Sequence, residues 1–324
     1  MCTALNITTK NHYFGRNLDL DCSYGEEVCI IPRNFPLCFR KEEAVESHYA
    51  MIGMATVVEE RPLFYDATNE HGLSMAGLNF PDNAFYPSEC EGKDNIAPFE
   101  FIPWIMGKCR SVGEARALLE RINLVNIPFS EKLPLSPLHW IISDRNESIV
   151  AEPMKDGLHI YGNPVGILTN NPPFEYHMFN LNNYRHLRTD NGEDVFLPEL
   201  PLKEYCRGLG GIGLPGDVSS MSRFVRIAFG KANSVCGDSE EESVSQFFHL
   251  LSSVEMCRGV CRAETGKWDI TVYSSCVNAD RGMYYYNTYD NRQIQCVDMH
   301  CADLEGSKIS RFALNTVQQI YYHN

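Results

Sequence analysis

The chain has 324 residues, of which 44% are hydrophobic and 22% are charged, and its formal net charge at pH 7 is −14. This composition is typical of a soluble globular protein, and the length suits one large domain or two. The negative charge argues against a nucleic-acid partner and against docking on anionic lipid, because both are polyanions.

The first predicted element is a β-hairpin over residues 1–20. An apolar, β-branched run leads into a polar turn near Lys10-Asn11, and a second aromatic and apolar run follows. Antiparallel pairing about this turn places Asp19 roughly opposite Cys2 and returns Arg16 to the same neighbourhood. The hairpin therefore gathers a thiol, a guanidinium and a carboxylate.

The remaining chain alternates between strand and helix patterns. Helical periodicity occurs at 98–122, 222–233 and 243–254. Period-two or β-branched runs predict further strands at 28–32, 49–58, 73–80, 139–144, 148–152, 158–161, 268–273, 283–289 and 293–297.

Two segments between these elements are predicted to be irregular. Residues 59–65 combine charges with aromatics and indicate an exposed turn, either a plain connector or the wall of an apolar pocket. Residues 198–221 are rich in glycine and predict a loop. A phosphate-binding loop is excluded there because no lysine follows the glycines. Strands at both ends and helices in two central blocks predict packed sheets covered by helices, an α+β fold in a single domain over 1–324.

The thirteen cysteines do not indicate a disulfide module or a metal site. Their number is odd, and Cys257 and Cys261 lack a second pair that would complete a zinc site. No apolar run approaches the roughly 20 residues of a membrane span, and the N-terminus lacks a signal-peptide pattern. We therefore expect reduced thiols, a cytoplasmic protein without stable membrane insertion, and no metal or other cofactor.

Cys2 is the candidate nucleophile. If Met1 is removed, which a small second residue normally permits, Cys2 carries both a thiol and a free α-amine. A free α-amine has a pKa of about 7.7–8.0, so part of it is neutral near pH 7 and can accept the thiol proton. Arg16 would favour the thiolate, and Asp19 could orient the ammonium. The alternative is that a cysteine after Met1 has no function.

Serine chemistry is a weak competitor in this sequence. There is no Gly-x-Ser-x-Gly motif, and the ten histidines show no paired arrangement. His139, beside Trp140, is interpreted as a packed or hydrogen-bonded core residue rather than a general base.

Several motifs together resemble one known family. The start Met1-Cys2-Thr3, followed by Phe14-Gly15-Arg16-Asn17-Leu18-Asp19, resembles the opening of the choloylglycine hydrolase family, N-terminal-nucleophile amidases that include bile salt hydrolases and penicillin V acylases. The resemblance implies the four-layer αββα sandwich of such hydrolases. It continues through Gly77-Leu78-Asn79-Phe80, Leu138-His139-Trp140, Gly166 to Pro172, Leu214 to Asp217, Ser222-Arg223-Phe224 and Tyr284 to Tyr289.

The resemblance also implies roles for individual residues. Cys2 would be nucleophile and base, with Arg16 and Asp19 as its electrostatic and orienting partners. Asn79 and Asn170 match the oxyanion and positioning groups, and Arg223 completes the polar network. The alternative interpretations are structural: the asparagines would stabilise turns, and Arg223 or its neighbour Arg226 would be a charged surface residue without a catalytic role.

The family divides between steroid amides and phenoxyacetyl amides. Members that favour penicillin V commonly carry tyrosine where this chain has Asn79, which favours conjugated bile salts as substrates, cleaved through a thioester at Cys2. The alternatives are penicillin V acylase activity and a catalytically silent steroid-binding protein. The resemblance further implies a homotetramer. The positions that match the substrate pocket are apolar or aromatic: Leu18, Val58, Tyr65, Phe129 and Leu133.

Overall fold

Two large antiparallel sheets form the centre of the protein. The computed structural model describes residues 1–197 and 199–324. One sheet has the order β12-β1-β2-β13-β14-β15 and comprises β1 (Cys2–Thr8), β2 (His12–Leu20), β12 (Ile167–Leu168), β13 (Ile270–Asn278), β14 (Met283–Thr288) and β15 (Gln295–Asp298). The other has the order β11-β10-β9-β6-β5-β4-β3-β16 and comprises β3 (Glu27–Ile31), β4 (Met51–Val58), β5 (Arg61–Asn69), β6 (Ser74–Asn79), β9 (Leu138–Ser143), β10 (Ser148–Met154), β11 (Gly157–Gly162) and β16 (Ser310–Ala313). A small parallel pair joins β7 (Asp94–Ile96) to β8 (Ile122–Leu124).

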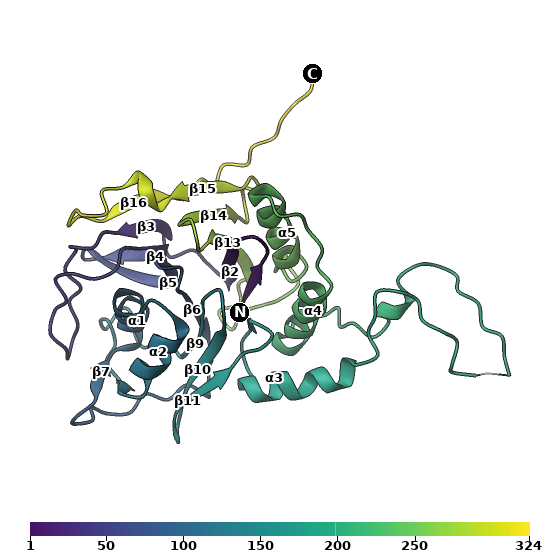
Figure 1. Cartoon of the computed structure of the whole chain (residues 1–324), viewed down its shortest axis with the longest axis horizontal. Coiled ribbons are helices and arrows are strands. Elements are labelled where there is room, and N and C mark those ends of the chain that lie inside the picture. The colour runs from purple at the N-terminus through teal and green to yellow at the C-terminus, as the bar shows by residue number, and fades with distance from the viewer. Residues whose placement is uncertain (198) are drawn as a thin grey trace.

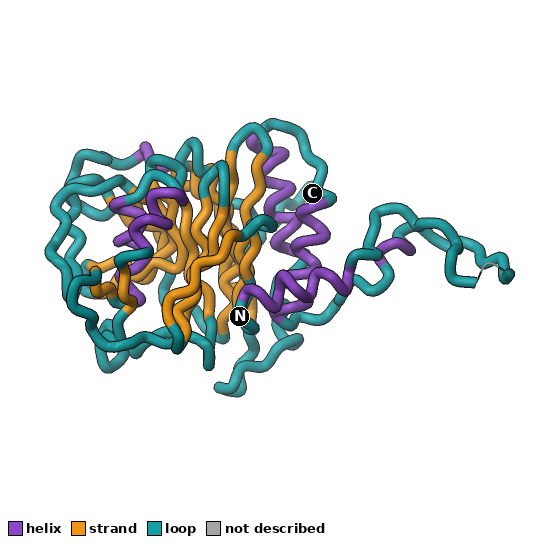
Figure 2. Tube along the Cα trace, turned by 60° about the horizontal axis from the view of Figure 1, so that its bottom comes forward, coloured by secondary structure: helices purple, strands orange, loops and turns teal. Residues whose placement is uncertain are grey.

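Helices contact both sheets. The α-helices are α1 (Phe101–Lys108), α2 (Val112–Leu119), α3 (Phe174–Asn180), α4 (Ser220–Ala232) and α5 (Glu240–Ser252), and short 3-10 turns are η1 (Pro98–Glu100), η2 (Leu181–Tyr184), η3 (Leu209–Gly211) and η4 (Met299–Cys301). Helix α1 packs against β5 and β6, whereas α4 packs against β1 and β12 and α5 against β2 and β13. In Figures 1 and 2 the strands accordingly lie in the middle, with helices on either side. The chain thus has the α+β architecture that the order of its elements predicts.

The buried apolar side chains form two clusters. One joins inward-facing residues of both sheets, such as Leu78 and Tyr273, and continues to α4 and α5. The second lies between the eight-stranded sheet and helices α1 and α2, around Trp140. Cys2 belongs to the first cluster, so the candidate nucleophile is buried within the larger core.

The start of α5 shows how local sequence specifies these helices. Ser239 Oγ accepts a hydrogen bond from the Glu242 N–H at 3.2 Å, and the Glu242 carboxylate reaches back to the Ser239 N–H. This capping box satisfies backbone donors that a helix start leaves without partners. Val244, Phe247 and Leu251, at helical spacing, are buried on one face.

The prediction of an exposed turn over 59–65 is wrong for most of its length. Only Glu59 and Glu60 form the turn, with φ angles of 51° and 59°, and β5 begins at Arg61. Two consecutive positive φ angles are typical of the two-residue hairpin turn. The usual sequence signal for that turn is Asn-Gly or Asp-Gly, which this chain lacks at the position.

The hairpin of β1 and β2 is confirmed, but its register differs by one residue from the prediction. Leu18, not Asp19, pairs with Cys2, and Thr8 pairs with His12 around the turn. Because side chains alternate along a strand, a slip of one residue moves a side chain to the opposite face of the sheet. Asp19 therefore lies on the other face from Cys2.

The chain between α3 and α4 projects away from the body of the molecule (Figure 1). The predicted loop over 198–221 begins at residue 198, which lies outside the described residues. From 199 to 219 the chain contains η3 and turns, and α4 begins at Ser220. Within the described residues, no helix is long and apolar enough to cross a membrane.

Candidate active site

The first two residues are fixed by backbone and side-chain hydrogen bonds. The Met1 ammonium donates to the Asp19 carbonyl at 2.6 Å, and the Asp19 N–H donates to the Met1 carbonyl at 2.8 Å. The Cys2 N–H, an amide while Met1 precedes it, donates to Asn170 Oδ1 at 2.7 Å. Removal of Met1 would convert this nitrogen to an α-amine that already has an acceptor beside it.

Arg223 and Asn170 form a buried clamp around Cys2. From α4, Arg223 donates to the Cys2 carbonyl, to Thr3 Oγ1 at 2.5 Å and to Asn170 Oδ1 at 2.7 Å. Asn170 Nδ2 donates to the Asn79 carbonyl at 2.8 Å. Burial lowers the pKa of Arg223, while the nearby Asp19 and Cys2 raise it in part. All three predicted residues around Cys2, namely Asn79, Asn170 and Arg223, are thus brought into one network.

Arg16 lies in the space between the two sheets. It pairs with Ala4 on β1, two residues from Cys2, so both side chains lie on the same face. Arg16 Nη1 donates to the carbonyls of Gly77 at 2.5 Å and Tyr65 at 3.0 Å, whereas its Nη2 is buried without a hydrogen-bond partner. Nη2 is therefore available to donate to the Cys2 thiolate or to an oxygen that approaches it.

A buried carboxylate that the sequence analysis missed faces Arg16. Asp66 on β5 accepts hydrogen bonds from the Tyr273 hydroxyl at 2.7 Å and the Tyr284 hydroxyl at 2.6 Å. Burial raises the pKa of Asp66, and the positive charge of Arg16 is the leading influence that lowers it. Asp66 lies just beyond the predicted turn over 59–65, in a stretch for which the sequence predicts no strand, so no local pattern marks it as buried.

Asp19 lies on the helix side of the six-stranded sheet and is fully buried. Its Oδ1 accepts from the Thr271 hydroxyl at 2.6 Å, and its Oδ2 has no partner. Burial raises the pKa of Asp19; Arg223, the N-terminal ammonium and the Thr271 hydroxyl oppose this rise. Thr271 carried no motif and was not identified from the sequence.

The predicted substrate-contacting residues divide into two groups. Leu18 is buried directly opposite Cys2, and Tyr65 joins the arginine network through its carbonyl. Val58, at the end of β4, and Tyr65 are half-buried. The ring centroids of Phe129 and Phe99 lie 5.2 Å apart in an edge-to-face contact. The Leu133 N–H donates to Ser130 Oγ in a tight turn. The structure therefore connects Leu18 and Tyr65 to the strands that carry Cys2 and Arg16, and it places Val58 at a strand end and Phe129 and Leu133 on a separate loop.

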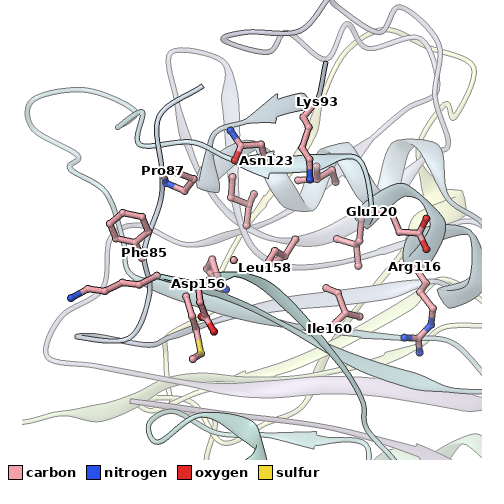
Figure 3. A pocket seen from close by; sticks show the side chains of 16 residues that line it. Phe85, Pro87, Lys93, Arg116, Glu120, Asn123, Asp156, Leu158 and Ile160 are labelled. Atoms are coloured by element: carbon pink, nitrogen blue, oxygen red, sulfur yellow. The ribbon is translucent and has the colours of Figure 1, made fainter. Parts of the chain in front are cut away.

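A cavity of about 620 Å³ lies apart from these residues, between α2, β8 and the β10–β11 hairpin (Figure 3). Its floor includes Leu158 and Ile160, and its rim carries both cations, such as Arg116, and anions, such as Glu120. None of the six predicted catalytic residues lines it. The cavity is therefore separate from the candidate site around Cys2.

All thirteen cysteines are free thiols. Across residues 1–197 and 199–324, no cluster of three or more His, Cys, Asp or Glu side chains is arranged to hold a metal ion.

Comparison with known proteins identifies the family. The family described as linear amide C–N hydrolases, choloylglycine hydrolase family, matches residues 2–312. A protein named bile salt hydrolase/transferase from Lactiplantibacillus plantarum is 52% identical over 324 residues, covering 100% of both chains. A crystal structure of a mutant conjugated bile acid hydrolase from Clostridium perfringens superposes with a TM-score of 0.93 at 40% identity, again covering 100% of both chains.

A more distant structure supports the fold alone. Penicillin V acylase from Agrobacterium tumefaciens has a TM-score of 0.75 at 17% identity and covers 96% of this chain and 90% of its own. Together, the family match over almost the whole chain and the full-length relatives confirm the resemblance of the sequence motifs. The protein is an enzyme that belongs to the choloylglycine hydrolase family of linear amide C–N hydrolases.

Proposed function

We propose that this protein hydrolyses the amide bond of glycine- or taurine-conjugated bile salts through a thioester at Cys2. The observation that carries the proposal is the buried clamp at the N-terminus, in which Asn170 accepts from the Cys2 nitrogen at 2.7 Å and Arg223 fixes the Cys2 carbonyl. This clamp occurs in a chain that is 52% identical to a bile salt hydrolase/transferase.

The chemistry requires no group beyond this chain and water. The α-amine of Cys2, freed from Met1, accepts the thiol proton, and Sγ attacks the carbonyl carbon of the substrate amide. The carbon–nitrogen bond breaks, the proton passes to the departing amine, and a thioester remains. Water then adds to the thioester carbonyl, which releases the bile acid and restores the thiol.

Each polar residue has a defined task in this scheme. Asn170 and Arg223 hold the amine, because Asn170 Oδ1 accepts from the Cys2 nitrogen and from Arg223. Arg16 Nη2, buried without a partner, is available to the thiolate. Asn79 has an exposed side chain at the end of β6 and is our candidate donor to the oxyanion, with Asn170.

Apolar side chains near the site favour a steroid over a smaller acyl group. Leu18 and Tyr65 border the Cys2 network, and Val58, Phe129 and Leu133 lie on the strand end and loop that we expect to complete the pocket. At about 25 cal/mol per Å² of buried apolar area, covering one steroid face contributes several kcal/mol of binding.

We also infer that the sheets and helices form the four-layer αββα sandwich of N-terminal-nucleophile hydrolases, and that the protein assembles as a homotetramer. The projecting segment between α3 and α4 supports assembly, because Phe196 and Tyr205 on it are 79% and 81% exposed. Analytical ultracentrifugation tests the homotetramer, and a monomer at micromolar concentration would contradict it.

The catalytic proposal is tested at Cys2. Cys2→Ser should abolish release of glycine from glycocholate, because a hydroxyl is far less ionised than a thiol near neutral pH. Cys90→Ser, at an exposed thiol, is the matched control and should retain activity. Activity of Cys2→Ser within about tenfold of the wild type, or an active wild type whose mass shows that it retains Met1, would contradict the mechanism.

Substrate class is tested by comparing glycocholate, taurocholate and penicillin V in one amine-release assay. We expect kcat/KM for a conjugated bile salt to exceed that for penicillin V by at least about tenfold, equivalent to about 1.4 kcal/mol of transition-state stabilisation. The reverse ranking would assign the protein to penicillin V acylase activity instead.

A further inference from the structure

Two hydroxyl groups of β13 donate to neighbouring side chains of β2 on the helix side of the sheet. The Thr271 hydroxyl donates to Asp19 Oδ1 at 2.6 Å, and the Ser274 hydroxyl donates to Asn17 Oδ1 at 2.7 Å. Both hydroxyl residues are buried. Only the first of these bonds ends on a residue that is hydrogen-bonded to the N-terminus.

We propose that Thr271 is a positioning residue that holds Asp19 so that its free carboxylate oxygen receives the α-ammonium of Cys2. The proposal rests on the proposed function, because it requires that Met1 is removed and that the α-amine of Cys2 takes part in catalysis.

A β-bulge places Thr271 for this task. Thr271 pairs with Asp19, and Tyr273 pairs with Leu18, so β13 uses one more residue than β2 at this point. In a regular strand, residues 271 and 273 would lie on the same face. The bulge instead directs Thr271 to Asp19 on the helix side and Tyr273 to Asp66 between the sheets. One strand therefore supports both sides of the site.

A second hydrogen bond fixes the direction of the Thr271 proton. The Met256 N–H donates to Thr271 Oγ1 at 2.8 Å, and this region of backbone is further held because the Thr271 N–H donates to the Met256 carbonyl. Since Oγ1 already accepts from Met256, its own proton is directed at Asp19 Oδ1. A hydroxyl held in this way donates to the charged form of a carboxyl group and so favours its ionisation.

The other carboxylate oxygen is left for the N-terminus. Asp19 Oδ2 is buried without a partner, and an unpaired buried charge is costly. The backbone of Asp19 is hydrogen-bonded to Met1 through both its N–H and its carbonyl. Loss of Met1 brings a new ammonium at Cys2, which has hydrogens beyond the one given to Asn170. Asp19 Oδ2 provides the acceptor for one of them.

Several charged or titratable groups surround Asp19 and bear on its pH response. Arg223 from α4, the N-terminal ammonium and Arg16 from β2 each lower the pKa of the Asp19 carboxyl, although burial raises it overall. The Cys2 thiol lies next to the N-terminus. The Cys261 thiol, which precedes β13, is close enough to the N-terminal ammonium and to Arg223 for both charges to lower its pKa, although burial raises that pKa overall. Loss of the Thr271 hydroxyl removes one of the influences that keep Asp19 ionised, so the Asp19 pKa should rise.

The test compares Thr271→Val with Thr271→Ser and with Ser274→Ala as the matched control. Thr271→Val should lower kcat by at least about tenfold with KM changed less than about threefold, and should move the acidic limb of the kcat profile upward by about half a pH unit or more. Thr271→Ser retains the hydroxyl and should follow the wild type. Ser274→Ala loses an equivalent bond to Asn17 but should keep the wild-type pH profile.

A second measurement does not depend on bile-salt turnover. The rate at which iodoacetamide alkylates Cys2, followed by mass spectrometry across pH, reports thiolate formation. Its pH profile should change in Thr271→Val but not in Thr271→Ser or Ser274→Ala. If Thr271→Val does not fold, Thr271→Cys keeps a similar size with a weaker donor and should give the same changes to a smaller degree.

The outcomes separate this inference from the proposed function. An unchanged pH profile in a folded Thr271→Val or Thr271→Cys, or an equal shift in Ser274→Ala, would overturn the role of Thr271. A wild type that cleaves no conjugated bile salt would overturn the proposed function, whereas the alkylation profile would still decide whether Thr271 acts on the N-terminus.

Discussion

Asn170 shows, at the scale of one residue, how a side-chain amide can serve the nucleophile. Its Oδ1 accepts from both the Cys2 nitrogen and Arg223, and its Nδ2 donates to the Asn79 carbonyl. A turn asparagine would be expected to bond mainly to its own segment. These three bonds reach residues from three other parts of the chain, which supports a positioning role over a turn role.

We therefore predict that Asn170→Ala reduces both turnover and stability. It removes a candidate oxyanion donor, so we expect kcat to fall about 100–1000-fold. It also removes the acceptor of the Cys2 nitrogen and of Arg223 Nη2, so we expect the free energy of unfolding to fall by about 1–3 kcal/mol. Asn79→Ala removes an exposed side chain, so its unfolding free energy should change by about 0.5 kcal/mol or less while kcat falls.

Urea denaturation and turnover on one conjugated bile salt measure both quantities for each variant. Normal turnover in a destabilised Asn170→Ala would show that the residue is architectural and would remove it from the catalytic set.

At the scale of secondary structure, Gly15 allows β2 to lie close to β13. A Cβ atom at this position would lie 1.9 Å from the Ser275 carbonyl oxygen and 2.9 Å from the Cys276 Cα, and both are backbone atoms. Backbone cannot rotate away as a flexible side chain can, so any side chain here separates the strands. Arg16 follows directly and would move with β2.

We predict that Gly15→Ala lowers the free energy of unfolding by about 1–3 kcal/mol or more and also reduces kcat, because strand separation displaces Arg16 and Asp19. Gly162→Ala is the matched control, since a Cβ at that β11 position meets no atom within 4 Å. Thermal unfolding and turnover of both variants provide the measurement. A stable, fully active Gly15→Ala would show that the two strands can separate without disturbing the site.

At the scale of the whole molecule, two buried histidines link stability to pH. Burial lowers the pKa of His12 and of His177 to about 4. His12 bonds to Thr8 at 2.9 Å, and His177 to the Asn170 carbonyl at 2.8 Å. Because both are neutral in the fold and protonate near pH 6.5 when unfolded, the unfolded chain binds more protons between pH 6.5 and 4.

The stabilising contribution of each histidine is therefore complete above pH 6.5 and is lost as the pH falls toward 4. For each histidine, the free energy of unfolding changes by about 1.4 kcal/mol per pH unit, which amounts to about 3 kcal/mol per histidine over the whole interval. Asp19 and Asp66 act in the opposite direction, because burial raises their pKa values. The histidine contribution must consequently be measured as a difference between variants.

We predict that the unfolding free energy of His12→Gln depends less steeply on pH than that of the wild type between pH 6.5 and 4. Urea denaturation at several pH values measures this slope, and His323→Gln, at an exposed position near the C-terminus, should leave it unchanged. An identical slope for the wild type and His12→Gln would show that His12 binds as many protons in the folded protein as in the unfolded chain.

Much of the fold and of the candidate site could be predicted from the sequence. The strands at 139–144, 148–152 and 158–161 correspond to β9, β10 and β11, and the two predicted helices at 222–233 and 243–254 correspond to α4 and α5 within a few residues. Strand β5 was missed because its hairpin turn uses two glutamates instead of the usual glycine-containing pair. Local patterns therefore predicted the elements wherever the local chemistry followed common rules.

The sequence by itself determined most of the larger elements and the candidate reactive groups, because periodicity, caps and the motif around Cys2 are properties of neighbouring residues. It also placed Arg16 and Asp19 on the strand that returns to Cys2. Only the tertiary structure decided the register, which puts Leu18 opposite Cys2 and Asp19 on the other face of the sheet. It alone paired Thr271 with Asp19, 252 positions apart. The physical reason is that contacts between distant residues depend on strand order, register and a bulge, which arise from packing the whole chain and leave no signal in a local stretch of sequence.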